Sequence, residues 1–498
     1  MLSVLIFGPV LAGLAVFLLR DGRQAKTLAL VLAALMVGWM GVVLRRFDVT
    51  APGMQLTEFV PWLPNLGLNY HLGCDGLSVS LLALNSIITW IVVYSTPAAV
   101  VRPRLYYGLV LWISGGLAGA FAAQNALLFV LFYELQLIPI YFLIGIWGGA
   151  RKEYAALKFL LYTAVSGILL LGGVLALGWL SGRAAFDYGA IRTTVAGLPL
   201  AVQGTLLLTL LLAFGIKTPL VPLHTWLPDA YVEASPPVAV LLGGILAKLG
   251  TYGLVRFGVQ LFPELWVQVS PVLALWGTAG VLFGALAAIA QKDIKRMVAY
   301  SSIGHMGYVM LGCATATPLS LVGAIAQMVS HGLILAILFH LVGVIEAKVG
   351  TRELDVLNGL MNPVRGLPTV SSLLVLGGMA SAGIPGMMGF VAEFLVFQGS
   401  YQVFPLQTLL CVLGTGLTAV YFVILLNRTC FGKLDNRTAY YPPVWASEKI
   451  PAFVLAGLIL FLGLQPHWLV QWSEQTAQNL ALTTVAVASP VSQLSPQS

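Results

Sequence analysis

The sequence contains very little charge. Asp, Glu, Lys and Arg together make up 9% of the 498 residues, and hydrophobic residues make up 59%. An ordinary soluble domain is about 25% charged. A chain of this composition lacks the polar side chains that would cover a soluble globule of its size, which argues against a water-soluble protein.

Cysteine and cofactor-binding motifs are scarce as well. The four cysteines lie far apart and form no CxxC pair, which indicates buried free thiols rather than metal ligands. The sequence has no dinucleotide-binding fingerprint, no P-loop and no haem motif, so cofactor chemistry has no visible site. The net charge of +7 would suit nucleic acid, but in a membrane protein an excess of Lys and Arg is more often a topology signal.

What the sequence has in abundance is long apolar segments. Segments of roughly 18 or more apolar residues are typical of membrane-spanning helices. We therefore predict an all-α polytopic membrane protein with about fourteen transmembrane helices. The predicted spans are 2–19, 27–44, 76–95, 106–123, 126–147, 156–180, 200–223, 236–257, 267–290, 297–315, 318–345, 367–399, 403–426 and 450–471.

Basic residues favour one set of loops. Most Lys and Arg follow odd-numbered spans, as Arg20, Arg102 and Lys292 do, whereas few follow even-numbered spans, among them Arg45 and Arg46. Loops rich in Lys and Arg stay in the cytoplasm. Both termini are therefore predicted to lie on the non-cytoplasmic side.

Five charged residues inside the predicted spans stand out: Glu134, Lys158, Lys217, Lys248 and Glu393. Each costs roughly 2.5–3.5 kcal/mol at mid-membrane if nothing pairs with it. Internal salt bridges or side chains that extend to the interface would explain them structurally, especially Lys158 near a helix start. Ionisable residues within the membrane more often mark an ion or proton path, and this is the interpretation that we favour.

Prolines interrupt the span around Lys217. Pro219 and Pro222 have no backbone N–H, so the carbonyls of Gly215 and Thr218 are expected to lose their helical partners. A helix broken at mid-depth is tolerated only where protein or water satisfies such carbonyls. Lys217 is therefore predicted to face a hydrated cavity.

A second break is predicted at Pro385, eight residues before Glu393. Two broken helices five spans apart suggest an internal repeat, and units with an odd number of spans must be inverted relative to each other. Inverted repeats with broken helices are typical of transporters. The predicted regions are N-terminal helices (1–100), a first repeat (101–258), a second repeat (259–430), and helix 14 with a tail (431–498).

Histidines and hydroxyls lie between these charges. Ser301, Ser302 and His305 open the tenth span, and His331 and His340 lie in the eleventh. Each histidine alone would suit a hydrogen-bonded core residue, but three in adjacent spans suit a proton relay, because histidine titrates near neutral pH. A metal site is the competing interpretation, and it lacks Cys or carboxylate ligands at useful spacing.

The motifs "GIKTPLVPLHTWLPDA", "ILAKLGTYGLVRF", "QKDIKRMVAYSSIGHMG" and "MVSHG" resemble, in series, the antiporter-like subunits of complex I. The resemblance is strongest to chain 4, because that chain carries Glu where Glu393 stands and its sister subunits usually carry Lys. "LPDAYVEASPPV" resembles the cyanobacterial and chloroplast form. Tyr231 and Ala239 stand where relatives often have His, which is compatible with a specialised paralogue such as the variant for CO2 uptake.

The resemblance implies a proton-translocating subunit of a ferredoxin- or NAD(P)H-driven (plasto)quinone oxidoreductase in a thylakoid or bacterial inner membrane. Partner subunits of the membrane and hydrophilic arms would carry the iron–sulfur clusters and the quinone, and this chain would bind no cofactor, metal or nucleic acid. The implied path residues are Glu134, Lys217, Lys248, His305, His331 and Glu393. Supporting residues would be Lys158, His224, Ser301, Ser302, His340, Pro219 and Pro385.

Three alternatives remain open from the residues alone. The chain could belong to a multisubunit Na⁺/H⁺ antiporter, to a membrane-bound hydrogenase, or to a purely structural part of a membrane arm. In the last case the buried charges would only lock helices together.

Overall fold

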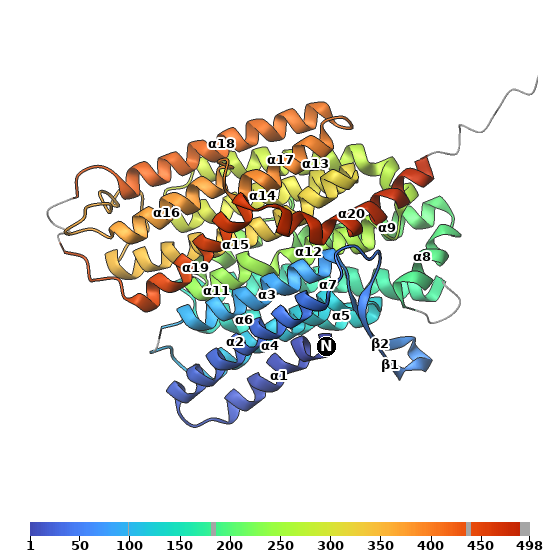
Figure 1. The fold of residues 1–498 in the computed structure, drawn as a ribbon, viewed down its shortest axis with the longest axis horizontal. Coiled ribbons are helices and arrows are strands. Elements are labelled where there is room, and N and C mark those ends of the chain that lie inside the picture. The colour runs from blue at the N-terminus through green and yellow to red at the C-terminus, as the bar shows by residue number, and fades with distance from the viewer. Residues whose placement is uncertain (98, 181–185, 435–439, 489–498) are drawn as a thin grey trace, which may run out of the picture.

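The structure is a computed structural model, and it describes residues 1–97, 99–180, 186–434 and 440–488. Its regular structure is almost entirely helical, and most of the long helices run in broadly the same direction across Figure 1. This follows from the composition, because a helix satisfies its own backbone hydrogen bonds where lipid offers none. The prediction of an all-α membrane protein is confirmed.

The N-terminal region holds three helices and a hairpin. They are α1 (Leu2–Leu18), α2 (Gly22–Arg46), β1 (Gln55–Leu63), the short η1 turn (Pro64–Leu66), β2 (Leu68–Cys74) and α3 (Gly76–Ser95). The antiparallel strands pair Phe59 with His71, and Gly67, with φ of 65°, makes the left-handed turn between them. The Asp75 side chain caps α3 by accepting a hydrogen bond from the Ser78 N–H.

The first predicted repeat contains several interrupted helices. Its elements are α4 (Pro103–Ala122), α5 (Ala126–Leu135), α6 (Leu137–Trp147), α7 (Lys152–Leu180), α8 (Tyr188–Ala196), α9 (Leu200–Lys217), α10 (Trp226–Glu233), α11 (Pro236–Leu241), η2 (Leu242–Leu246), α12 (Lys248–Gly253) and η3 (Leu254–Val259). The predicted break after Lys217 is observed between α9 and α10. The two η segments are π-helical turns on either side of α12, and π-helical turns are frequent at functional sites.

The second predicted repeat contains the longest helix. Its elements are α13 (Pro263–Ile289), α14 (Ile294–Thr315), α15 (Pro318–Val349), α16 (Pro368–Ser381), α17 (Met388–Ser400) and α18 (Pro405–Cys430). The predicted break at Pro385 is observed between α16 and α17. The division of the chain into two inverted repeats remains a prediction.

The C-terminal region differs from the prediction of one helix and a tail. The described residues from 440 to 488 instead contain two helices, α19 (Ala446–Leu464) and α20 (His467–Ala488). The predicted span 450–471 was wrong because Pro466 lacks a backbone N–H and ends the first helix. In Figure 1 α20 follows α19 across the front of the molecule, and it packs against α3 and α15.

Eleven of the described helices are long and apolar enough to cross a membrane, so the predicted count of fourteen is not established. The other three predicted spans correspond to α1, which has 17 residues, to α14, whose polar residues lower its hydropathy, and to the interrupted pair α16–α17. The structure bears out the multi-pass architecture and leaves the exact number of crossings as a prediction.

The helices differ sharply in how far they are buried. The apolar windows of Pro236–Val259 and Pro318–Val349 are 100% buried, whereas that of Gly22–Arg46 is 22% buried. The segment from α11 to η3 and helix α15 therefore form the centre of the fold. They carry Lys248 and His331, respectively.

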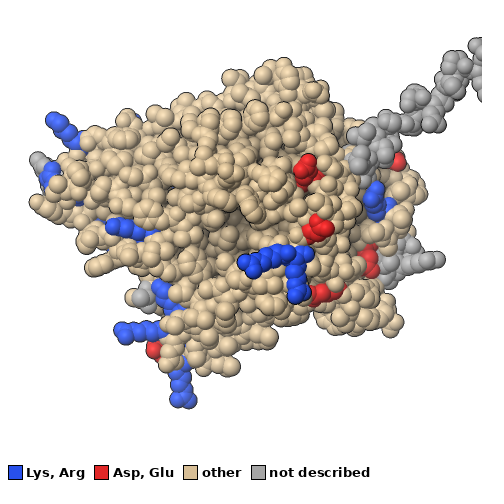
Figure 2. Space-filling model, in the orientation of Figure 1, with Lys and Arg blue, Asp and Glu red and all other residues tan. Residues whose placement is uncertain are grey.

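Charged side chains concentrate at the two ends of the bundle. Figure 2 shows Lys and Arg mostly at its left end, where the loop from α1 to α2 also lies in Figure 1, and Asp and Glu mostly on the right. This separation agrees with the basic loops of the sequence. The assignment of the basic end to the cytoplasm remains a prediction.

Candidate functional site

Lys248 and His331 contact each other at the centre of the bundle. Nζ of Lys248 on α12 lies 2.7 Å from Nδ1 of His331 on α15, and it also donates to the carbonyl of Gly243. Both side chains are buried, and Nε2 of His331 has no hydrogen-bond partner among the described residues. Of the two acceptors around the Lys248 amine, only the imidazole can take up a proton, and its second nitrogen can pass one on.

His305 lies next in line. Its ring centre is 5.7 Å from that of His331. Nε2 of His305 is 2.9 Å from the Ser381 hydroxyl, and Nδ1 is 3.1 Å from the Gln327 amide. A half-turn of that amide exchanges its nitrogen and oxygen, so Gln327 can serve Nδ1 either with or without a proton.

Glu393 ends this series of contacts. Its Oε1 lies 3.5 Å from Nδ1 of His305, and its Oε2 accepts a hydrogen bond of 2.9 Å from Thr415. The Thr415 hydroxyl is in turn 3.0 Å from the hydroxyl of Tyr308. Buried polar groups thus follow one another from Lys248 through both histidines to Thr415 on α18.

Glu134 and Lys217 form no direct ion pair among the described residues. Oε1 of Glu134 is buried without a hydrogen-bond partner, and its carboxylate rests on Gly167 of α7, where a methyl group would collide with it. Nζ of Lys217 lies 4.9 Å from the ring centre of Tyr133 and 5.9 Å from that of Phe159. The predicted ion pair is therefore not closed within the described part of the chain, and aromatic faces stabilise the ammonium instead.

Protein groups take up two of the carbonyls around Lys217, and the hydrated cavity remains a prediction. The backbone N–H of Leu220 donates to Gly215, so this carbonyl keeps a partner, contrary to the prediction. The indole of Trp226 donates to the carbonyl of Ile216 at 2.8 Å. The prediction is wrong for Gly215 because a wider backbone turn, with the donor five residues later, spans the missing N–H of Pro219.

Lys158 makes an ion pair at the edge of the first half. Its Nζ lies 2.7 Å from Oδ2 of Asp229 on α10, and Arg296 of α14 approaches the other oxygen at 3.5 Å. Asp229 was not predicted as a site residue, although it stands in the quoted motif "LPDA". This carboxylate joins α7, α10 and α14, so it couples the broken helix to its neighbours.

Other supporting residues lie outside the series of contacts. Nε2 of His340 donates to the carbonyl of Glu448 at 2.7 Å, which holds the ring near the start of α19. His224, in the segment between α9 and α10, packs against the ring of Phe283 of α13. The Ser301 hydroxyl is used within its own helix, where it donates to the carbonyl of Val298.

Two more of the predicted supporting residues, Ser302 and Pro385, lie on or beside helices that carry path residues. Ser302 is fully buried on α14, one turn from His305. Pro385 lies in the break that precedes α17, the helix of Glu393. Neither touches the ionisable groups directly in the contacts of the described residues.

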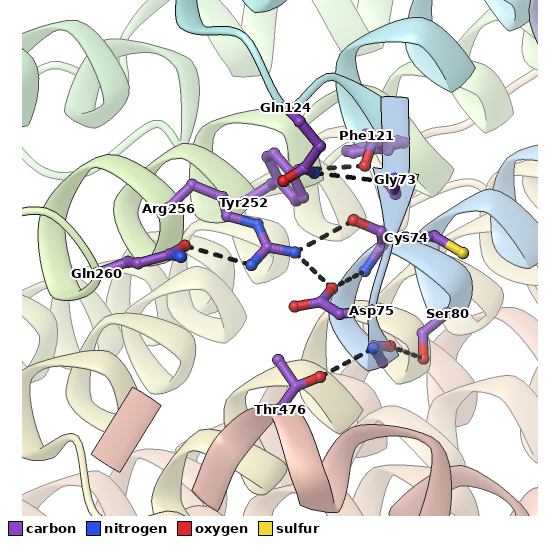
Figure 3. Close-up of polar contacts among 12 residues, drawn as sticks. Gly73, Cys74, Asp75, Ser80, Phe121, Gln124, Tyr252, Arg256, Gln260 and Thr476 are labelled. Atoms are coloured by element: carbon purple, nitrogen blue, oxygen red, sulfur yellow. Dashed lines mark hydrogen bonds and ion pairs between the residues drawn. The ribbon is translucent and has the colours of Figure 1, made fainter. Parts of the chain in front are cut away.

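A second buried ion pair was missed in the sequence. Arg256 on η3 pairs with Asp75 at the start of α3, and its guanidinium also reaches Ser78 at 3.2 Å and Gln260 at 3.3 Å. Figure 3 shows Arg256 pointing from its helix toward Asp75, beside the ring of Tyr252. The signal available was the "VRF" triplet, in which Arg256 closes an apolar segment only eight residues after Lys248.

The sequence of residues 123–418 matches the family described as "NADH:quinone oxidoreductase/Mrp antiporter, TM". NAD(P)H-quinone oxidoreductase chain 4 1 of Synechococcus sp. (strain JA-3-3Ab) is 39% identical over 98% of this chain and 92% of the relative. Chain 4 2 of Thermosynechococcus vestitus is 37% identical over 98% of this chain and 91% of the relative. The chain belongs to this family. The predicted resemblance to chain 4 is thereby confirmed.

Solved structures of the family have the same fold. A chain of respiratory complex I from Thermus thermophilus with bound NADH gives a TM-score of 0.88 at 28% identity, covering 97% of this chain and all 100% of that one. A chain of the Mrp complex from Dietzia sp. DQ12-45-1b gives 0.88 at 22% identity, covering 98% of both. The second likeness shows the fold alone. Both relatives are parts of multisubunit membrane assemblies.

Metal ligands do not gather in the described residues, where no group of three or more His, Cys, Asp or Glu side chains could hold an ion. The four cysteines are free and buried. The chemistry that the site does offer is proton exchange, because its buried groups are amines, imidazoles, carboxylates and hydroxyls within or near hydrogen-bond distance.

Proposed function

We propose that this chain moves protons across the membrane as a subunit of an NAD(P)H- or ferredoxin-driven quinone oxidoreductase. The observation that carries the proposal is the contact between Lys248 and His331, 2.7 Å from nitrogen to nitrogen. It links the central charged residue of one half to the histidines and Glu393 of the other. A structural ion pair would join opposite charges, whereas an amine on an imidazole suits transfer of a proton.

In the proposed mechanism the pair of Glu134 and Lys217 alternates between contact and separation. When the carboxylate is close, it holds the proton on Lys217; when it withdraws, the ammonium loses its counter-charge and passes the proton toward Lys248. The separated arrangement matches the present structure, in which Tyr133 and Phe159 surround the ammonium. Moving one charge against 100 mV costs about 2.3 kcal/mol. The interaction energy of an ion pair in a low-dielectric site changes by enough on opening to cover this cost.

The second half then carries the proton outward. Lys248 gives its proton to His331, and the imidazoles hand it on through His305 to Glu393. The hydroxyl of Thr415 bonds the far oxygen of Glu393, so it positions the carboxylate at the exit. Gln327 and Ser381 orient the His305 ring and thereby keep its nitrogens aligned along the path.

The similarity to chain 4 favours an oxidoreductase assembly over an antiporter, because the likeness to the Mrp complex is one of fold at 22% identity. In the proposal, partner subunits hold the iron–sulfur clusters and the quinone. The membrane is a cyanobacterial thylakoid or a bacterial inner membrane, with both termini on the non-cytoplasmic side. The same proposal includes a specialised role, such as CO2 uptake, for the assembly.

The proposal is tested by purifying the chain with its partners and reconstituting the assembly into closed vesicles. Addition of NAD(P)H or reduced ferredoxin with a quinone is expected to acidify one side of the vesicle membrane, without a need for sodium. Co-purification of iron–sulfur subunits is expected as well. Quinone reduction without acidification, or proton movement that depends only on a sodium gradient, would overturn the proposal.

A further inference from the structure

An apolar groove opens on the face of the molecule where α20 crosses the bundle. Its volume is about 290 Å³, and α2, α3, α15, α19 and α20 form its walls. Its lining includes Leu84, Val329, Leu458, Phe461, Trp468 and Trp472. The one hydroxyl in the lining, that of Ser80, donates to the carbonyl of Gly76, so the surface offered to a ligand is hydrocarbon.

The groove is open to the surroundings rather than sealed. Trp468 is 49% exposed and Phe461 is 48% exposed, although both line it. In a membrane protein these side chains face lipid, and tryptophan is enriched where the hydrocarbon meets the headgroups. The two tryptophans therefore indicate that the groove reaches from the headgroup level into the hydrocarbon.

An exposed arginine follows the groove lining directly in the chain. Leu44 lines one end of the groove, and Arg45 follows it directly as an exposed residue of α2. No ion pair or hydrogen bond joins the Arg45 side chain to another described residue, whereas Arg46 lies 3.5 Å from the sulfur of Met1. Figure 2 shows Lys and Arg side chains over this end of α2, on the same face as α20.

We propose that the groove binds one phospholipid, with an acyl chain among Leu84, Phe461 and Trp472 and the phosphate on Arg45. The hydrocarbon lining suits the chain, because an acyl chain leaves no polar group without a partner there. Arginine suits the phosphate, because its planar guanidinium forms charge-assisted hydrogen bonds to two phosphate oxygens at once. Bound in this way, the lipid fills the seam between α3 and the two C-terminal helices.

The size of the groove argues against a protein occupant. A membrane-spanning helix about 30 Å long and 10 Å wide fills roughly 2,000 Å³ or more, which is several times the 290 Å³ available. An acyl chain is narrower and flexible, so part of its length can lie in the groove while the rest stays in the bilayer. A quinone tail has a similar width, but its uncharged headgroup gives Arg45 no counter-charge.

The test measures lipid retention by the purified full-length chain with its partner subunits. The delipidated sample is incubated with vesicles of phosphatidylglycerol or of a monogalactosyl lipid with the same acyl chains, and bound lipid is measured by native mass spectrometry. The wild-type protein is expected to retain phosphatidylglycerol. The Arg45→Gln variant is expected to lose about fivefold in occupancy, as expected for one arginine near an anionic lipid.

Matched variants distinguish lipid binding in the groove from non-specific effects of a substitution on lipid retention. Arg23→Gln removes an exposed arginine at the opposite end of α2 and is expected to leave retention unchanged. Ala83→Phe fills the groove and is expected to abolish retention, whereas Gly38→Phe, where the space beside the backbone is open, is not. If Ala83→Phe fails to assemble, the Arg45 and Arg23 pair still decides the question.

Three results would overturn the proposal. The first is equal retention of the phospholipid and the galactolipid, which would remove any role for the phosphate. The second is equal loss in the Arg45→Gln and Arg23→Gln variants. The third is recovery of a quinone, or of a cross-linked segment of a partner subunit, from the groove of the wild-type protein.

Discussion

The carboxylate of Glu134 on α5 lies directly against the backbone of Gly167 on α7. A methyl group added at Gly167 would occupy the position of that carboxylate. The ionisable group thus depends on a residue that carries no side chain. Glycine provides the close approach, because any Cβ at this position would push the acid away.

The first prediction follows from this contact. Gly167→Ala is expected to displace Glu134 and to lower the number of protons pumped per electron, because catalytic groups moved by about 1 Å lose up to about a hundredfold in rate. Overpacking would also cost about 1–3 kcal/mol in stability. Gly172→Ala on the same helix is the control, since the space beside it is open. Equal pumping in the two variants would show that the contact has no role.

The second prediction concerns the charged pair itself. Glu134→Gln or Lys217→Ala is expected to abolish proton pumping in the assembled complex, because neither variant retains a pair that can open and close. Proton uptake by reconstituted vesicles measures this directly, with quinone reduction recorded in parallel. Glu264→Gln, at an exposed position at the start of α13, is the control. Wild-type pumping in both pair variants would reduce Glu134 and Lys217 to structural residues.

The third prediction separates two histidines of the same helix. His331→Gln is expected to slow pumping by about a hundredfold, the size of a typical general acid–base contribution, because it removes the group that contacts Lys248. His340→Gln also replaces a buried histidine of α15, but that ring bonds the carbonyl of Glu448. It is expected to pump normally. Equal losses in the two variants would argue for damage to α15 rather than to a relay.

The fourth prediction concerns the pair of Asp75 and Arg256. Removal of one partner alone is expected to destabilise the protein by about 3–5 kcal/mol, because the other charge is left buried and unpaired. The double variant Asp75→Asn with Arg256→Gln is expected to lose less than the sum of the single variants. Thermal unfolding of the solubilised protein measures each value.

An exposed pair provides the comparison for this cycle. Arg428 and Asp355 lie 2.7 Å apart, and both are more than half exposed. Their removal is expected to cost about 0–1 kcal/mol, as is usual for ion pairs in water. Each set of single and double variants gives a coupling energy for its pair. If the coupling energies of the buried and the exposed pair were equal, burial of Arg256 would have no energetic consequence.

The long apolar segments made the architecture predictable from the sequence. Pro219 and Pro385 placed the broken helices correctly, because a missing N–H acts locally and can be recognised in the chain. The same local argument failed for Gly215, whose carbonyl found a donor one residue further along, in Leu220. Sequence indicates where a helix is perturbed, but not which neighbour satisfies the perturbed group.

The sequence predicted several residues of the candidate site, but it did not predict which of them contact one another. Lys248, His331 and Glu393 stood out because charge and imidazole are costly in apolar segments. Asp75 and Gln327 did not stand out, because an acid at a helix start and an amide inside a helix are ordinary by themselves. Their partners come from distant segments, and only the folded chain brings them together.

The N–H of Gly76, at the start of α3, donates to the hydroxyl of Thr476 on α20 across 400 residues of chain. A ribosome synthesises α3 long before α20 exists. Until α20 is made, the Gly76 N–H lacks its Thr476 partner and needs a substitute such as water. The start of α3 is completed only by a helix from the far end of the described chain, so a chain cut short before Thr476 would leave that helix start unfinished.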